Sequence, residues 1–118
     1  MRGEARDAAL LWDMLQAARL ILEFTKGVGE KEFLADRKLQ FAVERAVSII
    51  GEAASKVSPG FRRLHPEIPW KAIIGQRHIL IHDYGRVDPL LVWNLTKVHV
   101  PRLVEQLEPL LPPAPEEE

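Results

Sequence analysis

The sequence predicts an all-α protein, an up-and-down bundle of four main helices joined by short connections. Apolar residues recur at helical spacing over most of the chain, and Pro and Gly residues separate the periodic stretches. No stretch shows the strict alternation of apolar and polar residues that a half-buried strand would show. Residues 1–111 are therefore expected to form a single domain. The Pro- and Glu-rich residues 112–118 are expected to form a disordered tail.

Composition narrows the class of protein further. Of 118 residues, 47% are hydrophobic and 28% are charged, as in an ordinary soluble domain. The chain has no cysteine, which excludes disulfides and thiolate metal sites and suits a cytoplasmic protein. No apolar run approaches the ~20 residues that a membrane-spanning helix needs. Residues 62–86 carry five basic and two acidic side chains, and this local positive charge suits a phosphate-bearing substrate.

The first helix is expected to run from about Glu4 to Lys26. It carries two neighbouring apolar stripes, which consist of Leu11, Leu15, Ala18 and Leu22 and of Leu10, Met14, Ala17 and Ile21. Together they are wider than the ~100° face that one core contact requires, which suggests a second contact surface. Gly27 and Gly29 predict the end of the helix and a turn.

A second, longer helix is expected from about Lys31 or Asp36 to Val57. Its apolar stripe consists of Leu39, Ala42, Ala46, Ile49 and Ala53. The small members of this stripe would let another helix approach closely. Gly51 costs a helix roughly 1 kcal/mol relative to Ala, so close packing is the expected reason for its presence.

The third helix carries the polar cluster described below. Proline and glycine break up residues 58–69, where Phe61–Leu64 is expected to form only a short helical turn. Pro69 fits the start of the third helix, because the missing N–H of proline is not needed in a first turn. Trp70 is expected to pack in the core rather than stack on a base. Gly85 is expected to end the helix.

The last helix is expected to begin at Asp88 and Pro89, which suit the N-cap and the first helical position. Helical spacing continues through Leu91, Leu95, Val98, Arg102 and Leu103. Pro101 falls inside this pattern and predicts a kink or a break.

Most of the reactive side chains lie within residues 77–84. This stretch contains Arg77, His78, His82, Asp83 and Tyr84, the only tyrosine of the chain. At 3.6 residues per turn, Arg77 and His82 are about 140° apart around the helix axis. A straight helix therefore does not direct both toward one small target. Either the helix ends or bends near His82, or a second chain completes the site.

Residue types alone leave three interpretations of this cluster open. Arg77 and the histidines could cap the end of a helix, where cations suit the helix dipole. His78 and His82, at i and i+4, could chelate zinc, although the Glu of the metalloprotease motif and a third ligand are missing. Alternatively, His82 could transfer protons and Arg77 could hold phosphate while a phosphodiester is cleaved.

Two polar residues of the second helix could contact the polar cluster of the third helix. Arg45 and Glu52 are seven residues apart and therefore lie near the same helix face. They lie either on the surface or in a buried polar bracket beneath the cluster.

The arrangement Arg77-x4-His82-x-Tyr84 resembles the R-x4-H-x-Y motif of the HepT-like proteins, a branch of the HEPN superfamily of small helical ribonucleases. The resemblance covers roughly residues 8–110 and includes, in order, Phe41–Ala46, Ile49–Ala53, Pro66–Trp70, Val87–Asp88 and Val92–Trp93. It implies a HEPN-like bundle that forms a symmetric homodimer, with the two motifs facing each other across a cleft. A two-fold axis would then bring two copies of Arg77 and His82 together.

The resemblance also implies a function. The chain would be the toxin of a toxin–antitoxin pair, an endoribonuclease that cleaves mRNA or tRNA, needs no metal or cofactor, and does not cleave DNA. His82 would transfer protons and Arg77 would stabilise phosphate charge, with His78 and Asp83 in support. The alternative is a non-catalytic nucleotide-binding or scaffolding subunit of a nucleotidyltransferase complex.

Tyr84 has a separate role in this family. HepT-like toxins are paired with an MntA-like minimal nucleotidyltransferase, an antitoxin that attaches AMP to the motif tyrosine. The resemblance thus implies that Tyr84 is the site of AMPylation. The nucleotide would add bulk and negative charge beside Arg77 and would neutralise the phosphate-binding cation. Before the family is considered, a buried aromatic ring with a satisfied hydroxyl explains Tyr84 equally well.

Overall fold

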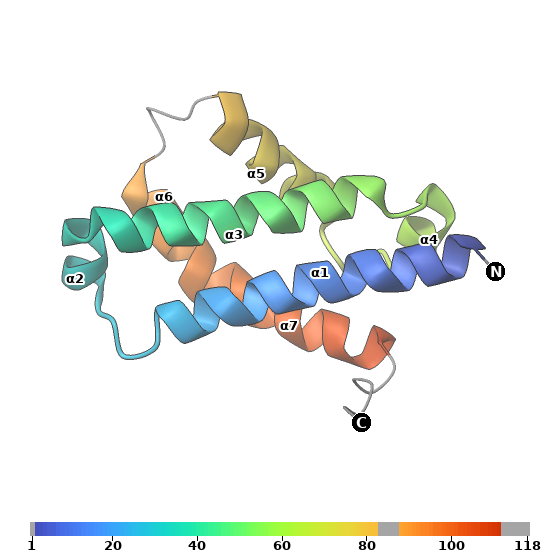
Figure 1. Ribbon diagram of the computed structural model, residues 1–118, viewed down its shortest axis with the longest axis horizontal. Helices are drawn as coiled ribbons and strands as arrows, with labels where there is room; N and C mark the ends of the chain where they lie inside the picture. Colours follow the sequence, from blue (N-terminus) through green and yellow to red (C-terminus); the bar gives the residue numbers. More distant parts are fainter. Residues whose placement is uncertain (1, 83–87, 112–118) are drawn as a thin grey trace.

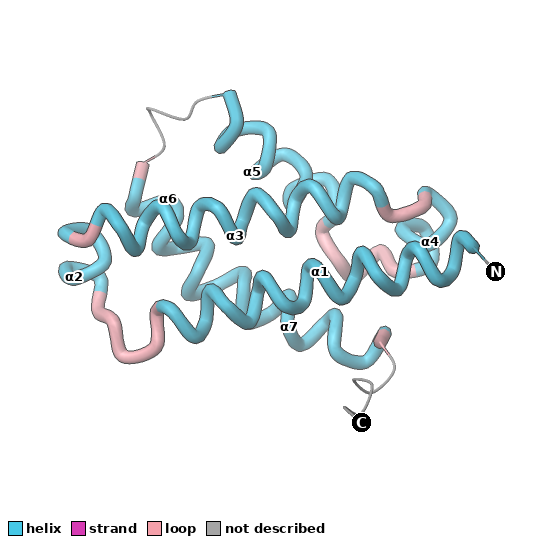
Figure 2. The backbone as a smooth tube through the Cα atoms, in the orientation of Figure 1, coloured by secondary structure: helices cyan, strands magenta, loops and turns pink. Residues whose placement is uncertain are grey.

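The computed structural model describes residues 2–82 and 88–111, and the regular structure of these residues is entirely helical (Figures 1 and 2). The main helices are α1 (Arg2–Phe24), α3 (Arg37–Lys56), α5 (Trp70–His82) and a last helix built from α6 (Pro89–Asn94), the π-helical turn η2 (Leu95–His99) and α7 (Val100–Leu107). The connections contain α2 (Glu30–Ala35) and α4 (Pro59–Leu64), and the 3-10 turn η3 (Glu108–Leu110) follows α7. The prediction of an all-α bundle is confirmed. The predicted tail, residues 112–118, lies outside the described residues.

The four main helices run alternately in opposite directions (Figure 1). α1 packs against both α3 and α7, and α3 also packs against α5. The first and last helices are therefore neighbours. An exposed ion pair between Arg19 and Glu108, at 2.8 Å, joins them at the surface. In the described part of the chain, no helix is long and apolar enough to span a membrane.

The broad apolar face of α1 is covered within the chain itself. Its buried hydrophobic residues are Leu11, Met14, Leu15, Ala17, Ala18 and Ile21. Because α3 and α7 both pack against this helix, its width needs no second chain as an explanation. Gly27 follows the helix with a φ of +74°, a conformation that suits glycine, so the predicted stop is confirmed.

α3 starts at the later of the two predicted positions. The carboxylate of Asp36 accepts a hydrogen bond from the Leu39 N–H at 3.0 Å and caps the helix. The preceding residues form the separate helix α2, and the buried side chain of Gln40 donates to the Phe33 carbonyl at 2.8 Å. A single helix from Lys31 was therefore wrong, because Asp36 ends one helix and caps the next.

The core face of α3 is centred slightly away from the predicted stripe. Its buried hydrophobic residues are Val43, Ala46, Val47, Ile50, Ala53 and Ala54. Of the predicted stripe, Ala46 and Ala53 are buried, whereas the other three members are only partly buried. The stripe thus marks one edge of the core face. Gly51 is buried, as the prediction of close packing requires.

α4 begins two residues before the predicted turn, because Ser58 caps the helix and Pro59 takes its first position. The hydroxyl of Ser58 accepts from the Phe61 N–H at 3.3 Å. The buried Asp7 of α1 in turn accepts from the N–H and the hydroxyl of Ser58, at 2.9 and 2.6 Å. This arrangement fixes the start of α4 and the chain that leads into α5.

The last helix begins as predicted. Asp88 accepts from the Leu90 N–H at 2.9 Å and caps α6, with Pro89 at the start of the helix. The disturbance predicted at Pro101 takes the form of the π-helical turn just before it, where the Val100 N–H donates to the carbonyl of Leu95, five residues earlier. A wider turn relieves the clash that a proline ring makes with the carbonyl four residues before it.

Candidate active site

α5, the helix that carries the motif, is anchored at its first residue. Trp70 is buried, and its indole N–H donates to the His65 carbonyl at 2.9 Å. Its ring meets the ring of Phe61 edge-on, with the centroids 6.3 Å apart. The preceding Ile68 is also buried. Trp70 is thus a packing residue, as predicted, and it fixes where α5 leaves the core.

The predicted catalytic positions lie at the far end of this helix. The backbone at Arg77, His78 and His82 is helical, and the described part of α5 extends to His82. Asp83 and Tyr84 lie outside the described residues, as does the predicted helix end at Gly85. Since positions 77 and 82 both belong to α5, the separation of about 140° around its axis applies. Within one chain, α5 therefore presents these two positions on different sides.

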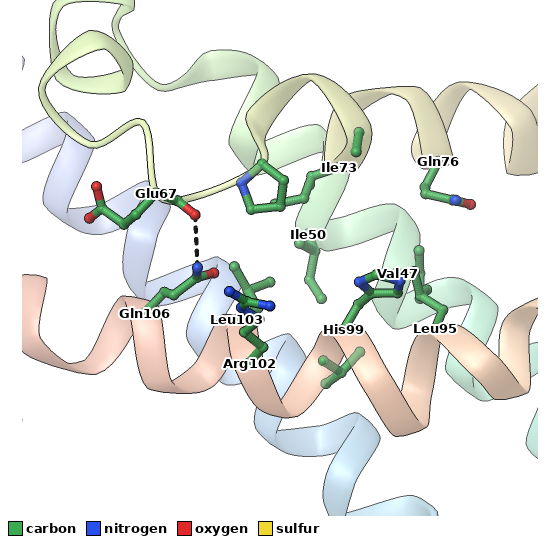
Figure 3. A pocket seen from close by; sticks show the side chains of 13 residues that line it. Val47, Ile50, Glu67, Ile73, Gln76, Leu95, His99, Arg102, Leu103 and Gln106 are labelled. Atoms are coloured by element: carbon green, nitrogen blue, oxygen red, sulfur yellow. Dashed lines mark hydrogen bonds between the residues drawn. The ribbon is translucent and has the colours of Figure 1, made fainter.

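A groove of about 400 Å³ runs beside α5, between this helix, α3 and the last helix (Figure 3). Its walls are mainly apolar and come from all three helices, with contributions from Val47, Ile50, Ala72, Ile73, Leu95, Val100 and Leu103. Gln76, which directly precedes the motif arginine, also lines it. The groove is large enough for a small molecule or a few side chains of a partner.

Polar side chains of the last helix line the same groove. Gln106 donates to the Glu67 carbonyl at 2.8 Å, which ties the last helix to the segment before α5 (Figure 3). His99 and Arg102 are exposed and also line the groove. Neither residue was predicted to belong to a site, and Arg102 was predicted only as part of the last helix. His99, Arg102 and Gln106 follow each other at intervals of three and four residues and therefore share one face of the helix.

The polar residues of α3 do not form a bracket beneath the site. Arg45 is exposed, and Glu52 is partly buried and pairs with the exposed Lys56 at 3.5 Å. The surface interpretation of Arg45 and Glu52 is therefore the correct one. The neighbouring Glu44 is different, because desolvation by burial raises the pKa of its carboxyl. It lies one turn from Val47, a lining residue of the groove.

Metal ligands do not cluster among the described side chains, where no group of three or more His, Asp or Glu residues could hold an ion. That description does not include the side chains of His78 and His82, which the zinc interpretation would need.

Comparison with known proteins gives a consistent result. A family model described as "Ribonuclease HepT-like" matches residues 14–110. A Thermococcus cleftensis protein named "Probable ribonuclease HepT" is 45% identical over 100 residues, which cover 85% of this chain and 91% of that protein. A candidate RNase of Methanocaldococcus jannaschii is 40% identical over 100 residues, covering 85% of this chain and 92% of its own length. No solved structure matches significantly.

Proposed function

The chain belongs to the family of HepT-like ribonucleases, and we propose that it is a metal-independent endoribonuclease whose reaction is carried by Arg77 and His82. The observation that carries this proposal is the R-x4-H-x-Y motif, at positions 77–84, within the segment that the family model matches. α5 supports the proposal, because it presents the motif at the end of a helix anchored in the core by Trp70.

The reaction needs one base, one acid and one cation. His82 takes the proton from a ribose 2′-hydroxyl, whose oxygen then attacks the adjacent phosphorus. Arg77 stays protonated and stabilises the additional negative charge on the phosphate oxygens. A protonated imidazole then donates a proton to the departing 5′-oxygen. The products are a 2′,3′-cyclic phosphate and a 5′-hydroxyl, with His78 and Asp83 as supporting polar groups.

A symmetric dimer solves the geometric problem posed by α5. Positions 77 and 82 are separated around the helix axis, so two copies of α5 related by a two-fold axis would bring Arg77 of one chain near His82 of the other. Light scattering at micromolar concentration should give twice the chain mass of 13.4 kDa. A mass of one chain would exclude this arrangement.

The proposed biological role is that of a cytoplasmic toxin controlled at Tyr84. A nucleotidyltransferase antitoxin would attach AMP to this tyrosine and thereby neutralise Arg77. Co-expression with such an enzyme should modify Tyr84, and the single tyrosine of the chain makes peptide mapping unambiguous. Tyr84→Phe retains the ring but removes the acceptor oxygen, so this variant should escape neutralisation. If the antitoxin silences Tyr84→Phe as well as the wild type, modification is not the switch.

The decisive experiment tests the chemistry directly. Purified protein is incubated in EDTA with a synthetic RNA and with the same strand carrying 2′-deoxyribose at the cleaved position. Cleavage of the RNA alone, with a 2′,3′-cyclic phosphate at the new end, is expected. Strict dependence on added zinc would transfer the role of His78 and His82 to metal binding. Failure to cleave any RNA would favour the alternative, a non-catalytic subunit of a nucleotidyltransferase complex.

A further inference from the structure

A positively charged surface lies at the first turn of α5, where side chains of α4 and α5 line one hollow. Arg62 and Arg63 of α4 and Lys71 of α5 line one open hollow, whose walls also include Trp70 and Ile74. We call the three cations the α4–α5 basic patch. In the described part of the chain, none of the three takes part in an ion pair.

Arg62 is the most unusual member of this patch. Its Nε is buried and has no hydrogen-bond partner among the described residues. A buried donor without an acceptor is destabilising, so such groups are rare in folded proteins. By contrast, the indole N–H of the buried Trp70, which also lines the hollow, donates to the His65 carbonyl. The Arg62 side chain as a whole is only partly buried and lines the hollow, so an anionic oxygen bound there would meet the charge of its guanidinium.

Two carboxylates near α4 and the start of α5 make contacts of their own and pair with none of the three cations. Asp7 accepts two hydrogen bonds from Ser58, and Glu67 pairs with His65 at 3.2 Å. The positive end of the α5 dipole adds to the field, since this helix begins at Trp70. The hollow therefore suits an anion that offers several oxygens to several cations.

The patch lies on the same side of α5 as part of the motif. Positions 74, 78 and 82 follow each other at intervals of one helical turn and therefore form one strip along α5. Lys71 begins this strip, about 16 Å before position 82 at 1.5 Å per residue. A strand held at His82 that runs along α5 toward α4 would reach the basic patch after a few nucleotides.

We propose that the α4–α5 basic patch is a second RNA-binding site, which holds phosphates of the single strand on one side of the cleaved bond. This inference rests on the proposed function, because it takes RNA as the ligand of α5. Cations that contact phosphates contribute affinity without base preference, and their contribution weakens as salt rises. The patch therefore sets how tightly the strand is held, and the motif sets where it is cut.

The test measures binding separately from cleavage. In a His82→Ala background, the affinity for a fluorescein-labelled single-stranded RNA is measured by anisotropy at several salt concentrations. The variant Arg62→Gln/Arg63→Gln/Lys71→Gln should bind roughly 10- to 100-fold more weakly at low salt. The slope of log Kd against log salt should fall by about two, at ~0.7 for each phosphate contact in a single strand.

A matched control removes the same charge from the opposite end of the bundle. The variant Lys26→Gln/Lys31→Gln/Lys38→Gln changes three exposed cations near α2 (Figure 1). It should retain the affinity and the salt slope of its His82→Ala parent. Equal losses in the two triple variants would mean that overall charge holds the RNA, and would overturn the proposal. So would a changed molecular mass of the patch variant, because the cations would then belong to an interface between subunits.

The test distinguishes failure of the second site from failure of the proposed catalytic function. If the wild type cleaves RNA and the patch variant binds as tightly as its parent, the second site is disproved and the ribonuclease function stands. If the wild type cleaves no RNA but the patch variant alone loses affinity, the ribonuclease function fails and the binding site stands.

Discussion

α3 and α5 are neighbouring helices that differ in how apolar residues are distributed around the helix axis. In α3 the buried residues occupy one face, and exposed polar residues such as Arg45 occupy the other. In α5 apolar residues occur on all sides, and none of positions 71–76 is fully buried once Trp70 has been passed. α3 packs against both α1 and α5, whereas the main partner of α5 is α3 alone. α3 is thus packed on two sides by other helices, whereas α5 leaves part of its surface uncovered by the described residues.

This difference indicates that another protein surface could bind to α5 more readily than to α3. An apolar helix that its own chain covers only in part can bind a further surface, and the proposed two-fold partner would supply one. The groove and the basic patch lie on either side of the same helix, with Ile73 lining one and Ile74 lining the other. Function is thus expected to depend on α5, and stability on α3.

The largest expected contrast concerns catalysis. Arg77→Ala and His82→Ala in α5 should each lower the cleavage rate by on the order of 10²–10⁴, because the proposed reaction uses each of these groups in the transition state. The free energy of unfolding should change by less than about 0.5 kcal/mol. The matched change in the exposed face of α3, Arg45→Ala, should leave the rate unaltered. Single-turnover cleavage and urea titration measure the two quantities, and a slow Arg45→Ala enzyme would contradict the contrast.

The second contrast concerns packing, with the same change made in both helices. Ile50 of α3 is 4% exposed, so Ile50→Ala should destabilise the fold by about 2–5 kcal/mol. Ile74 of α5 is only half-buried, and Ile74→Ala should cost about 1 kcal/mol. Urea denaturation of both variants checks this. An equal loss at Ile74 that grows with protein concentration would show that another chain covers α5.

A third contrast uses the glycine within each helix. A Cβ at Gly75 of α5 would meet no described atom within 4 Å, so Gly75→Ala should stabilise the protein by about 0.4–1 kcal/mol. Gly51 of α3 is buried, and Gly51→Ala should destabilise it by about 1–3 kcal/mol through overpacking. Thermal melting of the two variants should therefore shift in opposite directions. Shifts of the same sign would show that the space around the two glycines does not differ as described.

The smallest expected effect concerns Glu44 on the border of the α3 core. Burial raises the pKa of its carboxyl, so the folded protein binds this proton more readily than the unfolded chain does. The protonated carboxyl therefore favours the folded state, and this contribution to the free energy of unfolding is present in acid and is lost as pH rises through the raised pKa. Glu44→Gln should therefore increase the free energy of unfolding at pH 7 and leave it unchanged below the ordinary carboxyl pKa. An equal gain at both pH values would mean that charge is not the cause.

The fold was predictable wherever the decisive contact is local in sequence. Asp88 caps α6 two residues away, and Gly27 ends the first helix through its own backbone. The start of α4 was missed although Ser58 and Pro59 are a local cap signal of the same kind, whereas the support that Asp7 gives Ser58 from 51 residues away needed the fold. The width of the α1 face indicated a second contact correctly, but only the packing of α7 shows that the contact lies within the chain.

The site was predictable in part for the same reason. The motif is a local pattern, and the backbone of Arg77 and His82 indeed belongs to one helix. The groove could not be inferred, because Ile50, Ile73 and Leu103 meet only when three helices pack. The basic patch needed the fold as well, since Arg62 and Lys71 come from different helices with a break between them.

The π-helical turn has a consequence for insertions and deletions. Such a turn is an α-helix that has absorbed one additional residue, so the faces of α6 and α7 keep their relation despite the longer chain. Deleting the exposed Val98 should restore a regular ladder without rotating Leu103 out of the core. The same deletion would bring Pro101 against the carbonyl four residues before it, a clash worth about 3 kcal/mol. A chain shortened by this residue should therefore fold well only when Pro101 is replaced by Ala at the same time.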